Sequence, residues 1–382
     1  MNALPCSTHS SMRTALLVGL PLLAALGCGV PDAVVWFPDS NRFLYADQEG
    51  SRLVEYDVTK GESRVVLTNA ETNTPWPGLS ADGKLIAIGK SLTTYQEGSS
   101  DTTVETQVLI YDLNGELQQT SSLHTSHGEM MEPSFESKTE ITSVALNWSG
   151  PPEKILLHNA IWDRTTDQWL PLEVMPMPFE NVMVSPDKRG FVALADSDES
   201  EGLCFVDWQG RVKLFVEPED SLLNDEAGEL LASAWQGDKY CLYLTGGVVE
   251  YDTKTMQVAV RRESLPHLPA AGNLTCVCKF ADGRSQLCLF EVKDPNDPQA
   301  PPVDWSLQWQ APDKNQRKVL LTAGELAYPG GLASFFPSPD RTKVAVDTMS
   351  DAGDERRILV YDAAGEKVAD VAIEVAPVPT EW

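Results

Sequence analysis

The sequence predicts an all-β chain made of repeated four-stranded antiparallel sheets. Two turn signatures lead to this prediction, one that ends a strand with an aromatic residue and an aspartate, and one that pairs proline or glycine with aspartate. Both recur along most of the 382 residues. The hydrophobic content of 42% is sufficient to fill the cores between several small sheets.

The first signature is clearest in the segment 358–369, where Tyr361-Asp362 ends one strand and Gly365 lies in the turn before the next. An aspartate there accepts hydrogen bonds from the turn, and glycine adopts the positive φ that tight hairpins require. Equivalent pairs are Tyr56-Asp57, Tyr111-Asp112, Trp162-Asp163, Val206-Asp207 and Tyr251-Asp252.

The second signature lies two strands upstream of most of these pairs. Its copies are Pro38-Asp39, Asp82-Gly83, Pro186-Asp187, Asn224-Asp225, Asp282-Gly283 and Pro339-Asp340. Each unit therefore has four strands, A to D, with the second signature joining A to B and the first joining C to D. In the fifth unit this places the A–B turn at Asp225, before a strand from Glu229. The third unit, at about 134–172, lacks the clean second signature and begins with a strand over 142–148.

We count seven units between residues 33 and 375, which gives about 49 residues each, a length typical of a four-stranded propeller blade. The third and sixth units are degenerate, so six or eight blades are also compatible with the pattern. The paired turns resemble the TolB-like β-propeller repeat, a relative of the WD-type repeats. This resemblance implies blades around a central channel, with Tyr56, Tyr111 and Tyr251 buried between sheets. Residues 376–382 form either a tail or a segment that closes the ring.

The N-terminal segment has the features of an export signal. Arg13 precedes an apolar run over 15–26, which is shorter than the roughly 20 residues that span a bilayer. The ending Ala25-Leu26-Gly27-Cys28 resembles the bacterial lipobox. That resemblance implies a signal peptide over 1–27, a lipidated Cys28 with a short linker over 28–32, and membrane contact through acyl chains alone. An ordinary signal peptide with an incidental cysteine is the alternative. Gly29 does not match the aspartate that retains lipoproteins in the inner membrane of enteric bacteria, which favours the outer membrane.

Export places the chain in an oxidising compartment. Its remaining cysteines after Cys28 lie in apolar, strand-like runs and are Cys204, Cys241, Cys276, Cys278 and Cys288. Five thiols cannot all pair, and we expect buried free thiols. A bridge between Cys278 and Cys288 across a hairpin is the alternative.

The net charge of −27 opposes binding to nucleic acid, which requires a basic surface. The sequence contains no Walker loop for nucleotides, no Gly-x-Ser-x-Gly elbow and no His-Glu-x-x-His motif. We therefore expect a non-catalytic cell-envelope protein that has no cofactor and binds a protein or a glycan. The alternative is a propeller hydrolase or lyase that acts on glycans through channel carboxylates.

In a propeller, the B–C loops and the D–A connections share one face. Most insertions and many acidic residues of this sequence fall there, and long loops on a rigid scaffold commonly bind ligands. The candidate binding residues are Glu97, Asp101, His124, His127, Glu129, Asp196, Asp198, Glu199, Asp351 and Asp354. His124, His127 and Glu129 could together ligate a metal, but a polar loop is the preferred interpretation, and no metal site is predicted.

Overall fold

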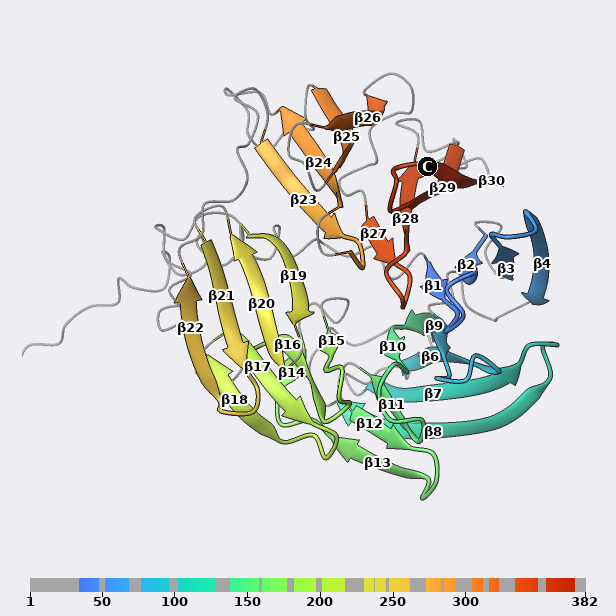
Figure 1. Cartoon of the computed structure of the whole chain (residues 1–382). Helices are drawn as coiled ribbons and strands as arrows, with labels where there is room; N and C mark the ends of the chain where they lie inside the picture. Colours follow the sequence, from blue (N-terminus) through green and yellow to red (C-terminus); the bar gives the residue numbers. More distant parts are fainter. Residues whose placement is uncertain are drawn as a thin grey trace, which may run out of the picture.

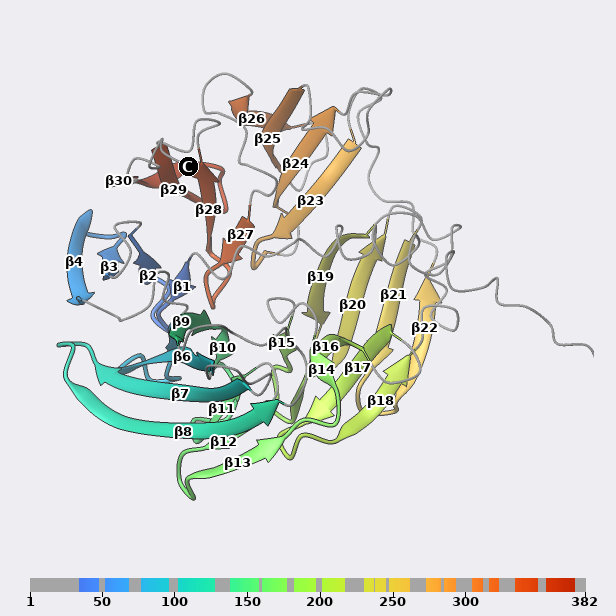
Figure 2. The same cartoon turned by 180° about the vertical axis from the view of Figure 1, so that it is seen from behind.

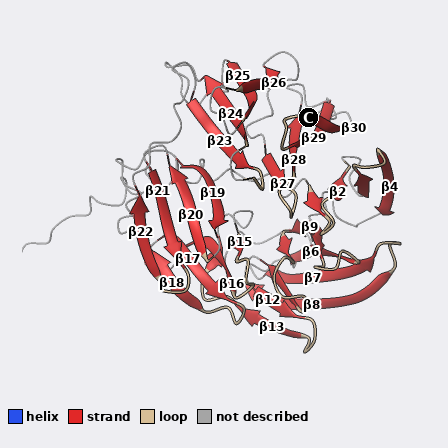
Figure 3. Ribbon diagram, in the orientation of Figure 1, coloured by secondary structure: helices blue, strands red, loops and turns tan. Residues whose placement is uncertain are grey.

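Seven antiparallel sheets stand around a ring in the computed structural model (Figure 1). The structure describes residues 34–47, 52–68, 77–95, 102–127, 138–157, 160–176, 182–196, 201–216, 230–236, 238–244, 247–261, 273–282, 285–292, 304–311, 316–322, 334–349 and 355–374. Every regular element within these ranges is a strand (Figure 3). The predicted all-β propeller with seven blades is thus confirmed, and the view from behind shows the same order of blades (Figure 2).

Each blade uses strands that follow one another in the chain. Blade 1 comprises β1 (Val35–Trp36), β2 (Arg42–Ala46), β3 (Leu53–Asp57) and β4 (Glu62–Leu67). Blade 2 comprises β5 (Pro77–Leu79), β6 (Leu85–Tyr95), β7 (Thr102–Asp112), β8 (Leu117–His127) and β9 (Lys138–Val144). Blade 3 comprises β10 (Leu146–Asn147), β11 (Lys154–Leu157), β12 (Ala160–Asp163) and β13 (Gln168–Pro171). Blade 4 comprises β14 (Met175–Pro176), β15 (Met183–Val184), β16 (Gly190–Asp196), β17 (Glu201–Asp207) and β18 (Val212–Val216).

The remaining three blades repeat the four-stranded order. Blade 5 comprises β19 (Leu230–Gln236), β20 (Lys239–Leu244), β21 (Gly247–Asp252) and β22 (Gln257–Arg261). Blade 6 comprises β23 (Asn273–Lys279), β24 (Gln286–Val292), β25 (Asp304–Gln310) and β26 (Arg317–Thr322). Blade 7 comprises β27 (Ser334–Pro337), β28 (Lys343–Met349), β29 (Glu355–Asp362) and β30 (Lys367–Glu374). The first strand of each blade lies nearest the ring centre, and the strands at the rim are β4, β8, β13, β18, β22, β26 and β30 (Figure 1).

The aspartates of the aromatic-Asp signature cap the C–D turns as predicted. In blade 1, Asp57 Oδ1 accepts hydrogen bonds from the backbone N–H groups of Thr59 and Lys60 at 3.0 and 3.1 Å. In blade 7, Asp362 Oδ1 accepts from Ala364 and Glu366 at 2.9 Å each. The same capping occurs at Asp112, Asp163, Asp207 and Asp252.

The A–B turns use their aspartates in the same manner. Asp39 Oδ1 accepts from the backbone N–H groups of Asn41 and Arg42 at 2.9 and 3.2 Å. Equivalent caps occur at Asp82, Asp187, Asp282 and Asp340. In blade 1 the two turns touch, because Val58 N donates to Asn41 O at 2.8 Å. A–B and C–D turns therefore share one face, which we call the turn face.

The first unit boundary that the structure corrects lies between blades 2 and 3. The segment 138–144, which the sequence analysis assigned to the third unit, pairs with β6 and belongs to blade 2. Only β10, two residues further on, pairs with β11 of blade 3. One extended stretch, 138–147, thus contributes first to one blade and then to the next.

The second correction concerns blade 5. The predicted A–B turn at Asp225 is wrong, because β19 starts at Leu230 and is itself strand A. Gln236 pairs with Lys239, so the chain turns from strand A to strand B between these two residues. A turn this short contains too few residues to form a recognisable motif. The longer Asn224-Asp225 motif was therefore assigned to the A–B turn instead.

The hydrophobic core lies between neighbouring blades. Trp162, Phe191 and Ile86 are completely buried, each between two sheets. Tyr56 and Tyr251 are buried as expected, whereas Tyr111 is half-buried against blade 1.

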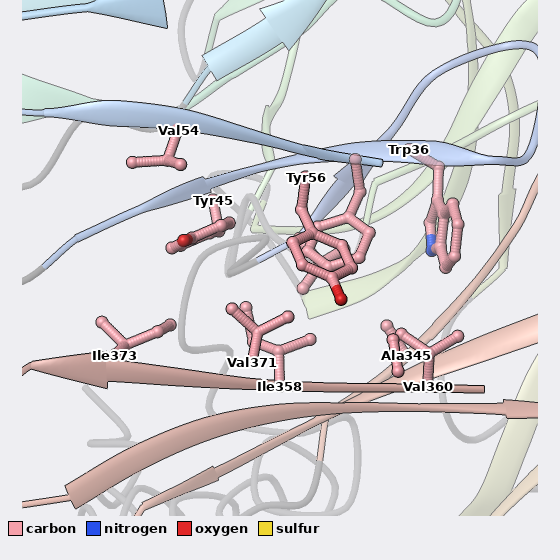
Figure 4. Packing of buried hydrophobic residues seen from close by; sticks show 12 residues of the cluster. Trp36, Tyr45, Val54, Tyr56, Ala345, Ile358, Val360, Val371 and Ile373 are labelled. Atoms are coloured by element: carbon pink, nitrogen blue, oxygen red, sulfur yellow. The ribbon is translucent and has the colours of Figure 1, made fainter. Parts of the chain in front are cut away.

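At the junction between blade 7 and blade 1, side chains from β1–β3 face side chains from β28–β30. Trp36, Tyr45 and Tyr56 point toward Val360, Val371 and Ile373 (Figure 4). Phe43, which is completely buried, lies 5.3 Å from both Trp36 and Tyr56 between ring centroids. This cluster closes the ring between the two ends of the described chain.

The thiols that the structure describes are free. Cys204, Cys241 and Cys288 are buried and Cys278 is half-buried, with no disulfide among the four. Desolvation raises the pKa of Cys204, Cys278 and Cys288 to about 12, so these thiols stay protonated. The alternative of a bridge between Cys278 and Cys288 is not realised.

Candidate functional site

The face opposite the turns receives the B–C and D–A connections of every blade, because antiparallel strands reverse direction at each turn. We call it the insertion face. Blade 2 projects furthest there. Its strands β6, β7 and β8 are 11 residues each, whereas those of blade 1 are five or six residues from β2 onward.

The projection of blade 2 is a continuous sheet, although the sequence analysis expected the insertions to form loops. Ser91–Tyr95 of β6 pairs with Thr102–Thr106 of β7, and β9 covers the other edge of β6. Hydroxyl side chains dominate both faces of this sheet. We call residues 89–95, 102–108, 121–127 and 138–144 the blade 2 extension.

On one face of the blade 2 extension, Glu105 forms a small polar cluster. Its carboxylate accepts a hydrogen bond from Gln107 Nε2 at 2.7 Å, and His124 Nε2 lies 3.9 Å from its Oε1. The bond from Gln107 holds the pKa of Glu105 below its ordinary value, and Ser122, His124 and Lys90 act in the same direction. A carboxylate with a lowered pKa is a weak proton acceptor, so this cluster suits ion pairing and hydrogen bonding rather than general-base chemistry.

The two histidines of the candidate set do not form a common site. His124 pairs with Glu105 and His127 pairs with Thr102 in the β7–β8 register. An offset of three along a strand places the two positions on opposite faces of the sheet. No cluster of three potential metal ligands occurs among the residues that the structure describes, and Glu129 lies outside them.

Most other candidate residues flank the described strands. Asp196 is the last residue of β16 and pairs with Glu201 and with Met175. Residues outside the described ranges are Cys28, Glu97, Asp101, Glu129, Asp198, Glu199, Asp351 and Asp354. The expectation that they form a binding surface stays a prediction.

A buried ion pair lies at the insertion face where blade 7 meets blade 1. The sequence analysis did not predict it. Arg356 Nε lies 3.0 Å from Asp347 Oδ1, and its Nη2 lies 2.9 Å from Asp347 Oδ2. Arg356 Nη1 also donates to the backbone oxygen of Ala46 at 3.2 Å. The exposed fractions of the Arg356 and Asp347 side chains are 9% and 12%. The pair thus fixes three strand ends next to two connections of the insertion face.

Apolar and small polar residues dominate the strands that surround the ring centre. Within the described residues, the strands β1, β5, β10, β14, β15, β19, β23 and β27 contain neither aspartate nor glutamate. Glu140 lies outside these strands, on β9, and its Oε2 accepts a hydrogen bond from Tyr95 at 3.2 Å.

The described ranges also include no helix long and apolar enough to cross a membrane.

Comparisons with known proteins support the fold. No family model matches the chain. The search of curated proteins also finds no match. Solved structures do match: prolyl oligopeptidase B from Galerina marginata has a TM-score of 0.51 at 12% identity, over 95% of this chain and 53% of its own. The chain therefore spans about half the length of that protein.

Two further solved structures give lower scores. A putative 6-phosphogluconolactonase from Bacteroides fragilis has a TM-score of 0.46 at 13% identity, over 91% of this chain and 97% of its own. TolB from Acinetobacter baumannii has a TM-score of 0.36 at 13% identity, over 87% of this chain and 78% of its own. The likeness to prolyl oligopeptidase B, at 12% identity, shows the fold alone.

Proposed function

We propose that this protein is a non-catalytic binding module of the bacterial cell envelope, anchored through a lipidated Cys28. It binds an envelope protein or a glycan through the insertion face. The observation that carries the proposal is the difference between the two faces. The turn face is closed by short, aspartate-capped turns, whereas the opposite face carries the blade 2 extension and receives the B–C and D–A connections, in whose sequences most of the acidic candidate residues fall.

The chemistry of the described residues supports binding rather than catalysis. Glu105 is engaged by Gln107 and has a lowered pKa. The inner strands present apolar and small polar residues, which favours a scaffold over the alternative of a glycan hydrolase or lyase with paired channel carboxylates. The likeness to solved propellers is compatible with this role because rigid rings commonly present loops to partners.

Site-specific photo-crosslinking tests the binding face. A photoreactive residue is placed at Glu97, Asp198 or Asp354 in the full-length lipoprotein, and cells are irradiated before the envelopes are solubilised. Matched controls carry the same group on the turn face at Lys60, Asn114 or Lys254. We expect a discrete crosslinked product from the first set and none from the second. Equal crosslinking from both sets would contradict the proposed face.

The anchor is tested separately. Labelling cells with a radioactive fatty acid should mark the wild-type chain and leave the Cys28→Ser variant unlabelled. The variant should also separate from the membrane fraction at high salt. Continued labelling of Cys28→Ser would exclude this cysteine as the acylated residue.

A further inference from the structure

The rim of the propeller carries one strand that differs from the other six. β8 is the longest outer strand, with 11 residues, and its sequence LQQTSSLHTSH contains neither proline nor a residue with a formal charge at neutral pH. Each of the other outer strands contains at least one of these. Their sequences are ESRVVL, QWLP, VKLFV, QVAVR, RKVLLT and KVADVAIE.

Charged residues and proline on edge strands matter because they oppose pairing with another chain. An outer strand presents unpaired backbone N–H and C=O groups, and lysine, glutamate or proline blocks their use by a neighbour. In this chain, six of the seven outer strands contain such a residue. The longest outer strand, β8, contains none. The contrast is notable in a sequence with 22% charged residues.

The outer edge of β8 is accessible in the structure. Among the described strands β8 pairs only with β7, whose register covers it from Leu117 to His127. Leu117 is 53% exposed, and Gln118, Thr120 and Ser122 are exposed as well. Blade 3 contacts side chains on one face of β8, where Ser121 and Gln119 meet Asp167 and Arg164, and no described strand pairs with the outer edge of β8.

We propose that β8 pairs with β8 of a second copy of this chain. In an antiparallel pair with a two-fold axis at Ser122, all 11 residues find a partner: Leu117 lies opposite His127 and Thr120 lies opposite His124. The pairing joins the blade 2 sheets of two rings into one continuous sheet. Because the two strands are identical and antiparallel, the contact closes on itself and ends at a dimer.

The absence of charge favours a second copy on β8 over the charged outer strands, and Pro171 opposes pairing along the uncharged β13. A molecule with a net charge of −27 repels its copy at long range, and this repulsion is screened within about 8 Å at physiological salt. The uncharged β8 edge adds no local repulsion. On the other rims, a two-fold pairing would bring residues such as Lys213 or Asp370 close to their own copies.

The test is the mass of the full-length protein in detergent by sedimentation equilibrium at pH 8. We expect a dimer for the wild type. The double variant Thr120→Lys with Ser122→Lys places like charges across the two-fold axis and should raise the dimer dissociation constant about tenfold or more. The double variant Thr120→Glu with Ser122→Glu should do the same. An equimolar mixture of the two variants should restore a dimer, because opposite charges then face each other.

The matched control is Gln257→Lys with Ala259→Lys, which adds the same charges to exposed positions of β22 in blade 5. It should leave the dimer intact, and thermal unfolding should confirm that every variant is folded. The proposal would be overturned if the wild type stayed monomeric at a protein concentration 100 times the lowest one that the experiment detects. A dimer that survives either β8 double variant would also overturn it, as would a failure of the mixed variants to associate. These outcomes are independent of whether the insertion face binds an envelope partner.

Discussion

Two junctions of the ring are joined in different ways. Between blades 2 and 3, the stretch 138–147 pairs first with β6 and then with β11, so the backbone itself belongs to both blades. Between blades 7 and 1, the described strands of each blade stay within their own sheet. That junction is held by the buried cluster around Phe43 and by side chains that reach across it.

The side chains of the closing junction act at both faces of the ring. At the turn face, Trp36 Nε1 donates to Phe336 O at 2.8 Å, and Lys343 Nζ donates to Ser40 O at 3.0 Å. At the insertion face, Arg356 binds Ala46. The comparison teaches that a junction without a shared strand depends on a few long side chains. It should therefore be more sensitive to single substitutions than a junction with a shared strand.

The largest expected effect is acid unfolding, which should weaken both junctions together. Hydrogen bonds in the turns lower the pKa of Asp57, Asp82 and Asp252, and the hydrogen bond from Lys154 is the main cause of the lowered pKa of Asp163. At Asp39, Asp187, Asp207 and Asp340, partial burial opposes ionisation, but hydrogen bonds outweigh it and the pKa is again lowered. A carboxyl whose folded pKa lies below its unfolded value of 3.8 stabilises the fold above that pH, and this stabilisation is lost as the pH falls through the folded pKa.

The urea midpoint of unfolding should therefore be insensitive to these carboxyls between pH 6 and pH 8 and should fall steeply below about pH 4. Hydrogen exchange should accelerate in 34–47 and in 138–147 over the same pH range. A midpoint that stays constant down to pH 3 would contradict this account of the caps.

The next largest effect is expected for Arg356→Met. The substitution leaves Asp347 buried without its cation and Ala46 O without its donor, and breaking a buried pair of this kind costs about 3–5 kcal/mol. The free energy of unfolding from urea titration measures the loss. Hydrogen exchange should rise in 34–47 on the far side of the junction.

The matched control for Arg356→Met is Lys154→Met. Lys154 pairs with Asp163 inside blade 3, where the two side chains are 12% and 16% exposed. Its loss should destabilise the fold without selective exchange in 34–47. Equal exchange patterns in the two variants would show that Arg356 does not act at the junction.

A smaller effect is expected for Trp36→Phe, which removes the indole donor to Phe336 O and part of a buried ring. We expect a loss of about 2 kcal/mol, from one hydrogen bond and reduced packing. Trp309→Phe is the comparison, since Trp309 Nε1 donates to Ala363 O at 3.1 Å between blades 6 and 7. Trp36→Phe should accelerate proteolysis of the N-terminal blade, and Trp309→Phe should not.

The smallest effect is expected at the junction with the shared strand. Ser121 Oγ donates to Asp167 Oδ1 at 2.8 Å and accepts from Trp169 Nε1 at 3.1 Å. Ser121→Ala removes both bonds, and we expect a loss of about 1 kcal/mol because the pairing of 138–147 is unaffected. A loss larger than that of Arg356→Met, measured under the same conditions, would reverse the comparison of the two junctions.

The fold could be predicted where turn chemistry is local. Asp57 and Asp362 cap the predicted turns. Each carboxylate accepts from a backbone N–H group two residues later, so the contact depends only on the local sequence. The prediction failed where no local signal exists. The stretch 91–95 is half-buried at every position and lacks hydrophobic alternation, so it resembled a loop.

The candidate site was less accessible to sequence reasoning. The acidic residues mark the insertion face, but whether they converge depends on contacts between distant segments. Register settled one case, since pairing with Glu105 and Thr102 separates His124 from His127. Arg356 was missed because its partner across the junction is a backbone oxygen of residue 46, which has no sequence signature.

The closing cluster has a consequence for the order of events on the ribosome. Trp36 emerges 300 residues before Phe336, whose backbone oxygen it will bind. Until then, the aromatic flank of the first blade has no sheet to cover it. A chaperone that shields this flank, or a delay in release of the nascent chain, should therefore raise the yield of closed rings.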